Sequence, residues 1–270
     1  MHKKFQHINA SVSYTLTGIK EPVIVLVHGF GEDATVWNEQ VGFLKENHRL
    51  LIPDLPGSGN SFFKNAEVAS SIDDFAEMIA ALLIHEKISH CIMLGHSMGG
   101  YITLAFAAKY PDMLEGFGLI HSTAFADSDE KKQNRLKGIT MMQEYGGYAF
   151  LKTTTPNLFS EAYKRNNASG VAALIEKGKD FLTAALQQYY QAMMQRPDRT
   201  DVLECSKVPV LFIIGTEDVA APMNDMLKQT HLPGISFIHI LNETGHMGMW
   251  EKPLEVNEAV DSFVRYVQSS

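Results

Sequence analysis

Short runs of consecutive apolar residues, separated by segments with helical periodicity, constrain this chain more than any other feature. From Pro22 onward there are six such runs, at residues 23–27, 50–52, 91–94, 117–120, 208–214 and 237–241. A strand that is apolar on both faces is typical of a parallel sheet that is covered by helices on both sides. The pattern therefore predicts an α/β fold with a mostly parallel sheet.

The segment before Pro22 has a different pattern. Val12, Tyr14 and Leu16 alternate with polar residues, so we expect a hairpin or meander at the edge of the sheet. Between the apolar runs, helical periodicity predicts helices at residues 35–46, 72–83, 98–109, 224–229 and 254–267. The sheet and the helices alternate regularly until about residue 121.

This alternation stops between Thr123 and Ser206. The segment has no strand-like run and consists of long polar stretches with helical periodicity, interrupted by glycine, proline or asparagine at 146–147, 156, 166–167 and 197. We interpret residues 123–206 as a helical insertion. It divides one α/β core into two parts, residues 1–122 and 207–270.

Composition limits the partners of the protein. Among its 270 residues are 31 acidic and 23 basic side chains, and the formal net charge of −8 opposes binding to nucleic acid phosphates. Cys91 and Cys205 lie too far apart in sequence to suggest a metal cage or a disulfide framework, and the apolar runs are too short to cross a bilayer. We expect a cytoplasmic protein without a membrane span that acts on a small-molecule substrate. The sequence leaves its oligomeric state open.

The strongest chemical signal lies directly after the apolar run at 91–94, in the sequence Gly95-His96-Ser97-Met98-Gly99. It matches the pattern G-x-S-x-G between a strand and a helix. In such a turn the glycines leave room where side chains would collide, and the serine hydroxyl is presented above the sheet. Ser97 is therefore the candidate nucleophile. The backbone N–H of Met98, at the start of the helix, is a candidate donor to an oxyanion.

A serine hydroxyl becomes a good nucleophile only when a base removes its proton, so this interpretation requires a histidine oriented by a carboxylate. Asp218 follows the run at 208–214, and His246 follows the run at 237–241. Loops at the carboxyl ends of parallel strands gather at one edge of a sheet. The chain order Ser97, Asp218, His246 fits this chemistry.

Other residues compete for these roles. Ten further histidines are present, but only His246 combines a glycine-flanked loop, a late position and a preceding strand. Glu217 and Asp54 are the rival acids. We prefer Asp218 to Glu217 because the shorter carboxylate, one residue further into the loop, suits a triad. Asp54 is expected to stabilise its own turn, and the loop at 121–124 has no carboxylate.

The second oxyanion donor is expected in the loop after the first central strand, which reads His28-Gly29-Phe30-Gly31. Its glycines let the backbone approach a reacting carbonyl group, so the amide of Phe30 is the candidate. The ring of Phe30 is expected to pack in the wall of the pocket.

Together these loops resemble the α/β-hydrolase superfamily. The resemblance rests on residues 28–31, 54–61, 95–100, 215–218 and 245–246, and it spans nearly the whole chain outside the insertion. It implies a mostly parallel eight-stranded sheet flanked by helices, a helical lid at residues 123–206, and no metal or organic cofactor. Residues 194–200 are similar to the corresponding segment of enol-lactone hydrolases and cofactor-free haloperoxidase-like esterases. Ser97 argues against the relatives that use an aspartate nucleophile.

The leading hypothesis is hydrolysis of a small carboxylic ester, thioester or lactone through an acyl-enzyme on Ser97. Hydrolysis of a C–C bond in a diketone, or perhydrolysis, would use the same residues. A rival is an NAD(P)-binding oxidoreductase, because residues 29–34 formally match G-x-G-x-x-G/A. Glu32 and Asp33 oppose it, since they would bring two negative charges to a pyrophosphate. A non-catalytic ligand receptor on the same fold is the third hypothesis.

Overall fold

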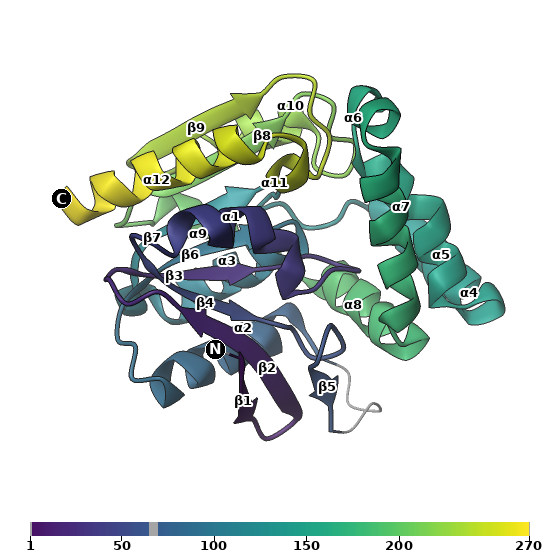
Figure 1. Cartoon of the computed structure of the whole chain (residues 1–270), viewed down its shortest axis with the longest axis horizontal. Helices are drawn as coiled ribbons and strands as arrows, with labels where there is room; N and C mark the ends of the chain where they lie inside the picture. Colours follow the sequence, from purple (N-terminus) through teal and green to yellow (C-terminus); the bar gives the residue numbers. More distant parts are fainter. Residues whose placement is uncertain (1, 65–69, 270) are drawn as a thin grey trace.

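A single sheet forms the centre of the molecule (Figure 1), in a computed structural model that describes residues 2–64 and 70–269. Its strands lie in the order β1-β2-β4-β3-β6-β7-β8-β9, and β5 pairs with β2 outside this order. From β4 to β9 all neighbours are parallel, whereas β2 is antiparallel to β1, β4 and β5. The strands are β1 (His2–Gln6), β2 (Ala10–Thr17), β3 (Val23–Val27), β4 (Arg49–Pro53), β5 (Phe62–Phe63), β6 (Cys91–His96), β7 (Leu114–Ile120), β8 (Val210–Gly215) and β9 (Ser236–Leu241).

This sheet confirms the predicted architecture. All six apolar runs lie in its parallel part, and the alternating segment before Pro22 forms the β1–β2 hairpin at one edge. The eight strands of the main order agree with the number expected, and the two-residue strand β5 is a ninth. The strand expected at 208–214 begins only at Val210, directly after Pro209, which has no N–H to donate to a neighbouring strand.

Helices cover both faces of the sheet (Figure 1). Successive residues of β3 point into two different apolar clusters: Val25 and Val27 pack on the side of α2 and α3, and Ile24 and Leu26 on the side of α1 and α12. This explains why the central runs are apolar without interruption. The helices of the core are α1 (Asn38–Leu44), α2 (Ile72–His85), α3 (Met98–Lys109), α10 (Met223–Leu227), α11 (Gly248–Glu251) and α12 (Pro253–Ser269), with the 3₁₀ helices η1 (Ala34–Trp37) and η2 (Pro111–Met113).

The helix predicted at 35–46 is divided in two, since η1 precedes α1. By contrast, α2 begins where the sequence supplies its cap. The Ser71 hydroxyl accepts a hydrogen bond from the Asp74 amide, and the Asp74 carboxylate accepts one from the Ser71 amide, at 3.1 and 2.7 Å. This reciprocal pair satisfies N–H groups that lack a partner inside the helix.

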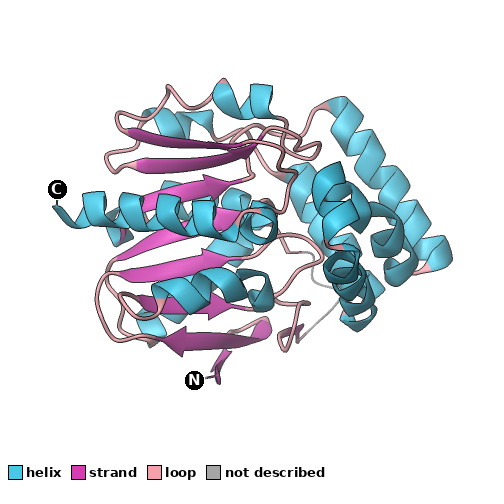
Figure 2. Cartoon of the chain, turned by 45° about the horizontal axis from the view of Figure 1, so that its top comes forward, coloured by secondary structure: helices cyan, strands magenta, loops and turns pink. Residues whose placement is uncertain are grey.

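Residues 121–209, between β7 and β8, contain only helices and loops, and we refer to them as the helical segment. Helices α4 to α8 lie beyond the carboxyl ends of the parallel strands (Figure 2). No helix in the described part of the chain has both the length and the apolar character needed to cross a bilayer. The helical segment contains α4 (Asp129–Tyr145), α5 (Gly147–Thr154), η3 (Thr155–Leu158), α6 (Glu161–Asn166), α7 (Ala168–Lys177), η4 (Gly178–Asp180), α8 (Thr183–Gln195) and α9 (Thr200–Glu204).

Ion pairs hold the helical segment in place. Lys177 Nζ, at the end of α7, lies 2.6 Å from the Asp33 carboxylate in the loop after β3. Near the start of the segment, the buried Asp127 carboxylate lies between Arg135 and Arg196, at 2.6 and 2.8 Å. Because Arg196 follows α8, the pair with Asp127 joins the two ends of the segment. The helices above the sheet are therefore anchored at their ends and at α7.

Candidate active site

Ser97 occupies the tight turn between β6, which ends at His96, and α3, which begins at Met98. Its backbone has φ +52° and ψ −114°, a conformation that residues other than glycine rarely adopt. The flanking glycines make this turn sterically feasible. A Cβ at Gly95 would lie 2.2 Å from the carbonyl oxygen of Gly99, and a Cβ at Gly99 would lie 2.2 Å from the carbonyl oxygen of Val27.

The backbone of Ser97 is fixed while its hydroxyl is left available. Its N–H donates to the carbonyl oxygen of Ile120 over 3.0 Å, and its carbonyl oxygen accepts a hydrogen bond of 2.7 Å from the Ser122 hydroxyl. Ser97 is partly exposed, and its Oγ makes no hydrogen bond with a described residue. The turn thus presents a hydroxyl without a competing partner.

The structure brings Asp218 and His246 together. Nδ1 of His246 donates to Oδ2 of Asp218 over 2.8 Å. The other carboxylate oxygen, Oδ1, accepts from the amides of Ala220 and Ala221, each at 2.9 Å. Both Asp218 and His246 are buried. Because Nδ1 carries the proton that Asp218 accepts, Nε2 is the basic nitrogen of the ring.

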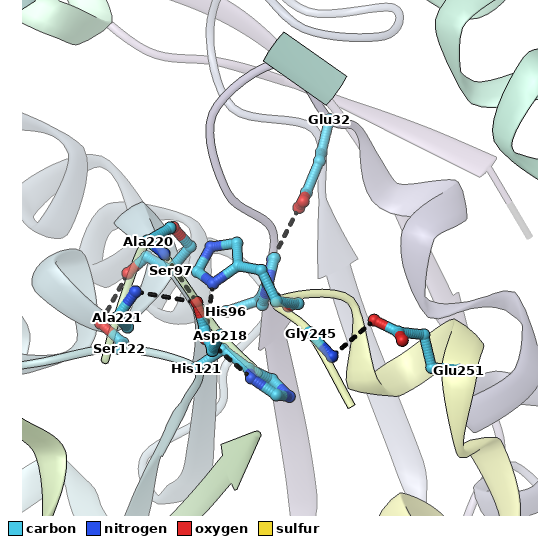
Figure 3. Close-up of polar contacts among 11 residues, drawn as sticks. Glu32, His96, Ser97, His121, Ser122, Asp218, Ala220, Ala221, Gly245 and Glu251 are labelled. Carbon is cyan, nitrogen blue, oxygen red and sulfur yellow. Dashed lines mark hydrogen bonds and ion pairs between the residues drawn. The ribbon is translucent and has the colours of Figure 1, made fainter. Parts of the chain in front are cut away.

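A second imidazole shares the same carboxylate oxygen. Nδ1 of His121, the first residue after β7, lies 3.1 Å from Oδ2 of Asp218 (Figure 3). Burial alone would raise the pKa of Asp218, but the charge of His246 and the hydrogen bonds from His121 and His246 hold it well below its ordinary value. Asp218 is therefore an ionised carboxylate with four hydrogen-bond donors.

His96 connects the loop of the candidate base to the loop after β3. Its Nδ1 lies 3.0 Å from the Glu32 carboxylate, and its Nε2 lies 2.9 Å from the carbonyl oxygen of His246 (Figure 3). Both ring nitrogens face an acceptor, so the ring carries a proton on each. Burial alone would lower the pKa of His96, but the charge and hydrogen bond of Glu32 raise it above its ordinary value. The buried pair is an imidazolium next to a carboxylate.

The ring of His246 packs against the residue that precedes Ser97. The rings of His96 and His246 have centroids 4.8 Å apart, and Ser97 follows His96 in the chain. Among the described residues, Ser97 Oγ and His246 Nε2 are not joined by a hydrogen bond. Hydrogen bonds of this kind are often long without substrate and tighten when it binds.

The two candidate oxyanion donors follow β6 and β3, which are neighbouring strands. Met98 is the first residue of α3, where the N–H of a helix has no intrahelical acceptor, and Phe30 lies in the loop directly after β3. Neither amide donates to a described residue. The ring of Phe30 packs 4.6 Å from that of Tyr190, in the helical segment, as expected for a residue in a pocket wall.

The model of the family described as the alpha/beta hydrolase family matches residues 24–259, from β3 into α12. The chain belongs to the alpha/beta hydrolase family. This match confirms the resemblance to the α/β-hydrolase superfamily that the loop motifs indicate, and it confirms the prediction that the protein is a hydrolase.

Solved structures and curated proteins agree with this assignment. A thermophilic esterase from Thermogutta terrifontis, with malate bound, covers 99% of both chains with a TM-score of 0.92 and 27% identity. A probable esterase from Oryza sativa subsp. japonica is 26% identical over 254 residues, which are 87% of this chain and 88% of that protein. The dihydrolipoyllysine-residue acetyltransferase component of the acetoin cleaving system of Pseudomonas putida is 28% identical over 246 residues. That match covers 90% of this hydrolase but only 63% of the Pseudomonas protein.

The rival acids of this hydrolase lie elsewhere. Glu217 is exposed, and Asp218 takes the position beside His246. The Asp54 carboxylate accepts from the amides of Asn60, in its own turn, and Ala34, at 3.0 and 2.9 Å, so Asp54 does stabilise its turn as expected.

The cluster at Asp218 contains residue types that can bind a metal ion. The ligand atoms of His121, Asp218 and His246 lie within 4.8 Å of one another, which is close enough for three metal ligands. However, Nδ1 of each histidine already donates to the carboxylate, at 3.1 and 2.8 Å. A metal ion would have to replace both hydrogen bonds, so the arrangement fits a hydrogen-bonded acid and base.

Sequence reasoning missed His121, Glu32 and His96 as parts of the site. The prediction for the loop at 121–124 concerns only a carboxylate, although β7 and β8 are neighbours and their carboxyl ends bring residues 121 and 218 together. That strand order was the signal that could have found His121. Glu32 and His96 lie in the two motifs, but their pairing depends on β3 lying beside β6.

Proposed function

We propose that this hydrolase cleaves a small carboxylic ester, thioester or lactone, with Ser97 as nucleophile, His246 as general base and Asp218 as the acid that orients His246. The observation that carries the proposal is the 2.8 Å hydrogen bond between Asp218 and Nδ1 of His246, next to the strained turn that holds Ser97. Such a bond fixes the tautomer in which Nε2 can accept the serine proton.

In the proposed reaction, Nε2 of His246 takes the proton of Ser97 as Oγ attacks the carbonyl carbon. The amides of Phe30 and Met98 stabilise the oxyanion of the tetrahedral intermediate; losing one such donor typically costs about 3 kcal/mol of transition-state stabilisation. The intermediate collapses, and the leaving alcohol takes the proton from His246. His246 then takes a proton from a water molecule, whose oxygen attacks the acyl carbon. As the bond to Ser97 Oγ breaks, Oγ takes this proton back and the acid is released.

We also propose that residues 123–206 form the lid of the pocket, inserted between core parts 1–122 and 207–270. A cavity of about 80 Å³ supports this, because it lies between the loop after β3 and the helical segment. Its lining includes Phe30 and Gly31 from the core and Leu151, Leu158, Leu174 and Tyr190 from the helical segment. Ser97, Asp218 and His246 do not line this cavity, so it supports the position of the helical segment over the loop after β3 and does not define the size of the substrate.

The esterase relatives support ester hydrolysis, and other observations bear on the alternatives. Glu32 accepts a hydrogen bond of 2.7 Å from the Gly29 amide, and Lys177 pairs with Asp33, so acids fill the turn that a pyrophosphate would need. This argues against an NAD(P) site. Both cysteines are free thiols, which fits the cytoplasmic location we propose.

The test is covalent labelling of the serine with a fluorophosphonate probe, combined with a panel of p-nitrophenyl esters of graded chain length, lactones and meta-cleavage diketones. We expect Ser97→Ala to abolish both labelling and turnover, while Ser89→Ala, at an exposed position, retains them. Equal labelling of the Ser97→Ala protein would show that another residue is the nucleophile. Turnover of diketones alone would favour C–C bond hydrolysis by the same residues.

A ligand receptor is the second candidate, because a karrikin insensitive 2 receptor of Petunia hybrida is 26% identical over 259 residues, covering 88% of this chain. A receptor without turnover would bind one compound tightly and hydrolyse no member of the panel.

A further inference from the structure

His121 is a buried histidine that takes no part in the proposed reaction. It contacts Asp218, the residue that orients the proposed base His246. It lies directly after β7 with φ +48° and is fully buried. Its Nδ1 lies 3.1 Å from Oδ2 of Asp218, the same oxygen that accepts the hydrogen bond from His246. A left-handed backbone at a non-glycine residue is costly, so the surrounding structure holds this side chain in place against strain.

We infer that His121 is a positioning residue, which shares the Asp218 carboxylate with His246. His246 is thereby a weaker base than it would be if it were the only imidazole bound to that carboxylate. The inference rests on the proposed function, since it assigns a role within the same site.

The geometry excludes His121 as an alternative base. Its Nε2 is buried and has no hydrogen-bond partner among the described residues. It faces Gly248, where a Cβ would lie only 2.3 Å away. A proton on Nε2 would therefore be buried without an acceptor, and burial lowers the pKa of His121 to about 4. At neutral pH His121 is an uncharged donor that points its one N–H at Asp218.

An uncharged donor on this oxygen acts on His246 through the carboxylate. Oδ2 divides its hydrogen-bonding capacity between two imidazoles, while Oδ1 is occupied by the amides of Ala220 and Ala221. Each donor stabilises the carboxylate charge and so reduces what that charge contributes to holding a proton on His246.

Other charged groups also contact His246 or the loop that carries it. His96, paired with Glu32, contacts the ring and the carbonyl oxygen of His246. Glu251, on α11, accepts a hydrogen bond of 3.1 Å from the amide of Gly245. None of these residues is replaced in the variants of residue 121, although the ring of His96 also lies next to that of His121, with centroids 6.0 Å apart.

The experiment compares His121→Leu with His121→Asn. Leucine removes the donor, whereas the asparagine amide places an N–H near the position of Nδ1 and also tolerates a left-handed backbone. We measure the rate of Ser97 labelling by a fluorophosphonate and the hydrolysis of a p-nitrophenyl ester from pH 4.5 to 9. We also follow the titration of the His246 ring by NMR, and His90→Asn, at an exposed position, is the control.

For His121→Leu we expect the acidic limb of both pH profiles, and the midpoint of the His246 titration, to move up by about one pH unit. We expect kcat on the plateau to fall about ten-fold, because Asp218 and the base lose alignment. In His121→Asn, the pH midpoints and kcat should return towards the wild-type values. If residue 121 mattered only through backbone strain, its replacement would change thermal stability without moving the His246 titration.

An unchanged titration in His121→Leu, or an equal shift in His121→Asn, would overturn the inference. Failure of the proposed function looks different. In that case wild-type Ser97 is not labelled at any pH, and the NMR titration still decides whether His121 acts on His246.

Discussion

Nε2 of His96 lies 2.9 Å from the carbonyl oxygen of His246, so the residue before the proposed nucleophile holds the backbone of the proposed base. On the other side of the ring, Nδ1 lies 3.0 Å from the Glu32 carboxylate, which also accepts from the Gly29 amide. One buried ion pair thus joins the loops that follow β3, β6 and β9. The loop with the proposed oxyanion donor and the loop with the proposed base therefore share a single support.

Replacing Glu32 by glutamine should test this support. The substitution leaves His96 without its counter-charge in a fully buried position, and removing one partner of a buried pair typically costs about 3 kcal/mol or more. We expect the free energy of unfolding, measured in urea at pH 7, to fall by this amount, and kcat to fall as well. Glu39→Gln, on the exposed side of α1, is the matched control and should match the wild type. Wild-type stability in Glu32→Gln would mean that the pair does not support the loops.

Gly99 should tolerate no side chain. A Cβ there would lie 2.2 Å from the carbonyl oxygen of Val27 and 2.8 Å from that of His28, and neither backbone atom can move away without disturbing β3. We expect Gly99→Ala to lose about 3 kcal/mol or more of stability, or to yield no folded protein.

The matched control is Gly42→Ala, because a Cβ at this position of α1 meets no atom within 4 Å. Alanine favours a helix over glycine, so this variant should gain about 0.5–1 kcal/mol in thermal unfolding. If both variants behaved alike, close packing of the turn around Ser97 would not explain its glycines.

Gly31 links the oxyanion loop to the helical segment. It has φ +67°, and a Cβ there would lie 2.8 Å from Cδ2 of Leu151. Gly31→Ala should cost about 1–3 kcal/mol, because both the backbone conformation and the contact oppose a methyl group. Adding Leu151→Ala removes the contact but not the backbone strain. We therefore expect the double variant to lose less stability than the two single losses combined, as measured by urea denaturation.

Much of this candidate site could be predicted because the strands, and the loops that follow them, are encoded by local sequence patterns. Ser97, Asp218 and His246 each follow a continuous apolar run, and such runs predict parallel strands with their carboxyl ends together. His121 and Glu32 could not be found in this way. Their roles depend on which strands are neighbours in space, since β7 lies beside β8 and β3 beside β6. The helix predicted at 35–46 is also divided into η1 and α1, and Asp33, whose carboxylate accepts from the Thr35 amide, caps the start of η1.

The pH dependence of stability gives a last prediction about His121. Its pKa is lowered from 6.5 to about 4, chiefly by burial. Between pH 4 and 6.5 the imidazole of residue 121 binds a proton in the unfolded chain but not in the folded chain. The free energy of unfolding therefore rises with pH through this range. The contribution is fully present above pH 6.5 and is lost as the pH falls towards 4. For a fully buried ring it amounts to at most about 3 kcal/mol.

We therefore expect the wild-type free energy of unfolding, measured in urea from pH 4 to 7.5, to fall more steeply on acidification than that of His121→Asn. His7, His48 and His239 also have pKa values lowered chiefly by burial, and they add to the slope in both proteins. The difference between the two slopes isolates residue 121. Asp218 adds little to either slope, because its pKa is lowered in the folded protein and its contribution to stability is lost only as the pH falls through 3.8, the ordinary value of an aspartate, and below. Parallel curves would mean that His121 accepts a proton as easily in the folded state as in the unfolded one, which contradicts an orphaned Nε2 packed against Gly248.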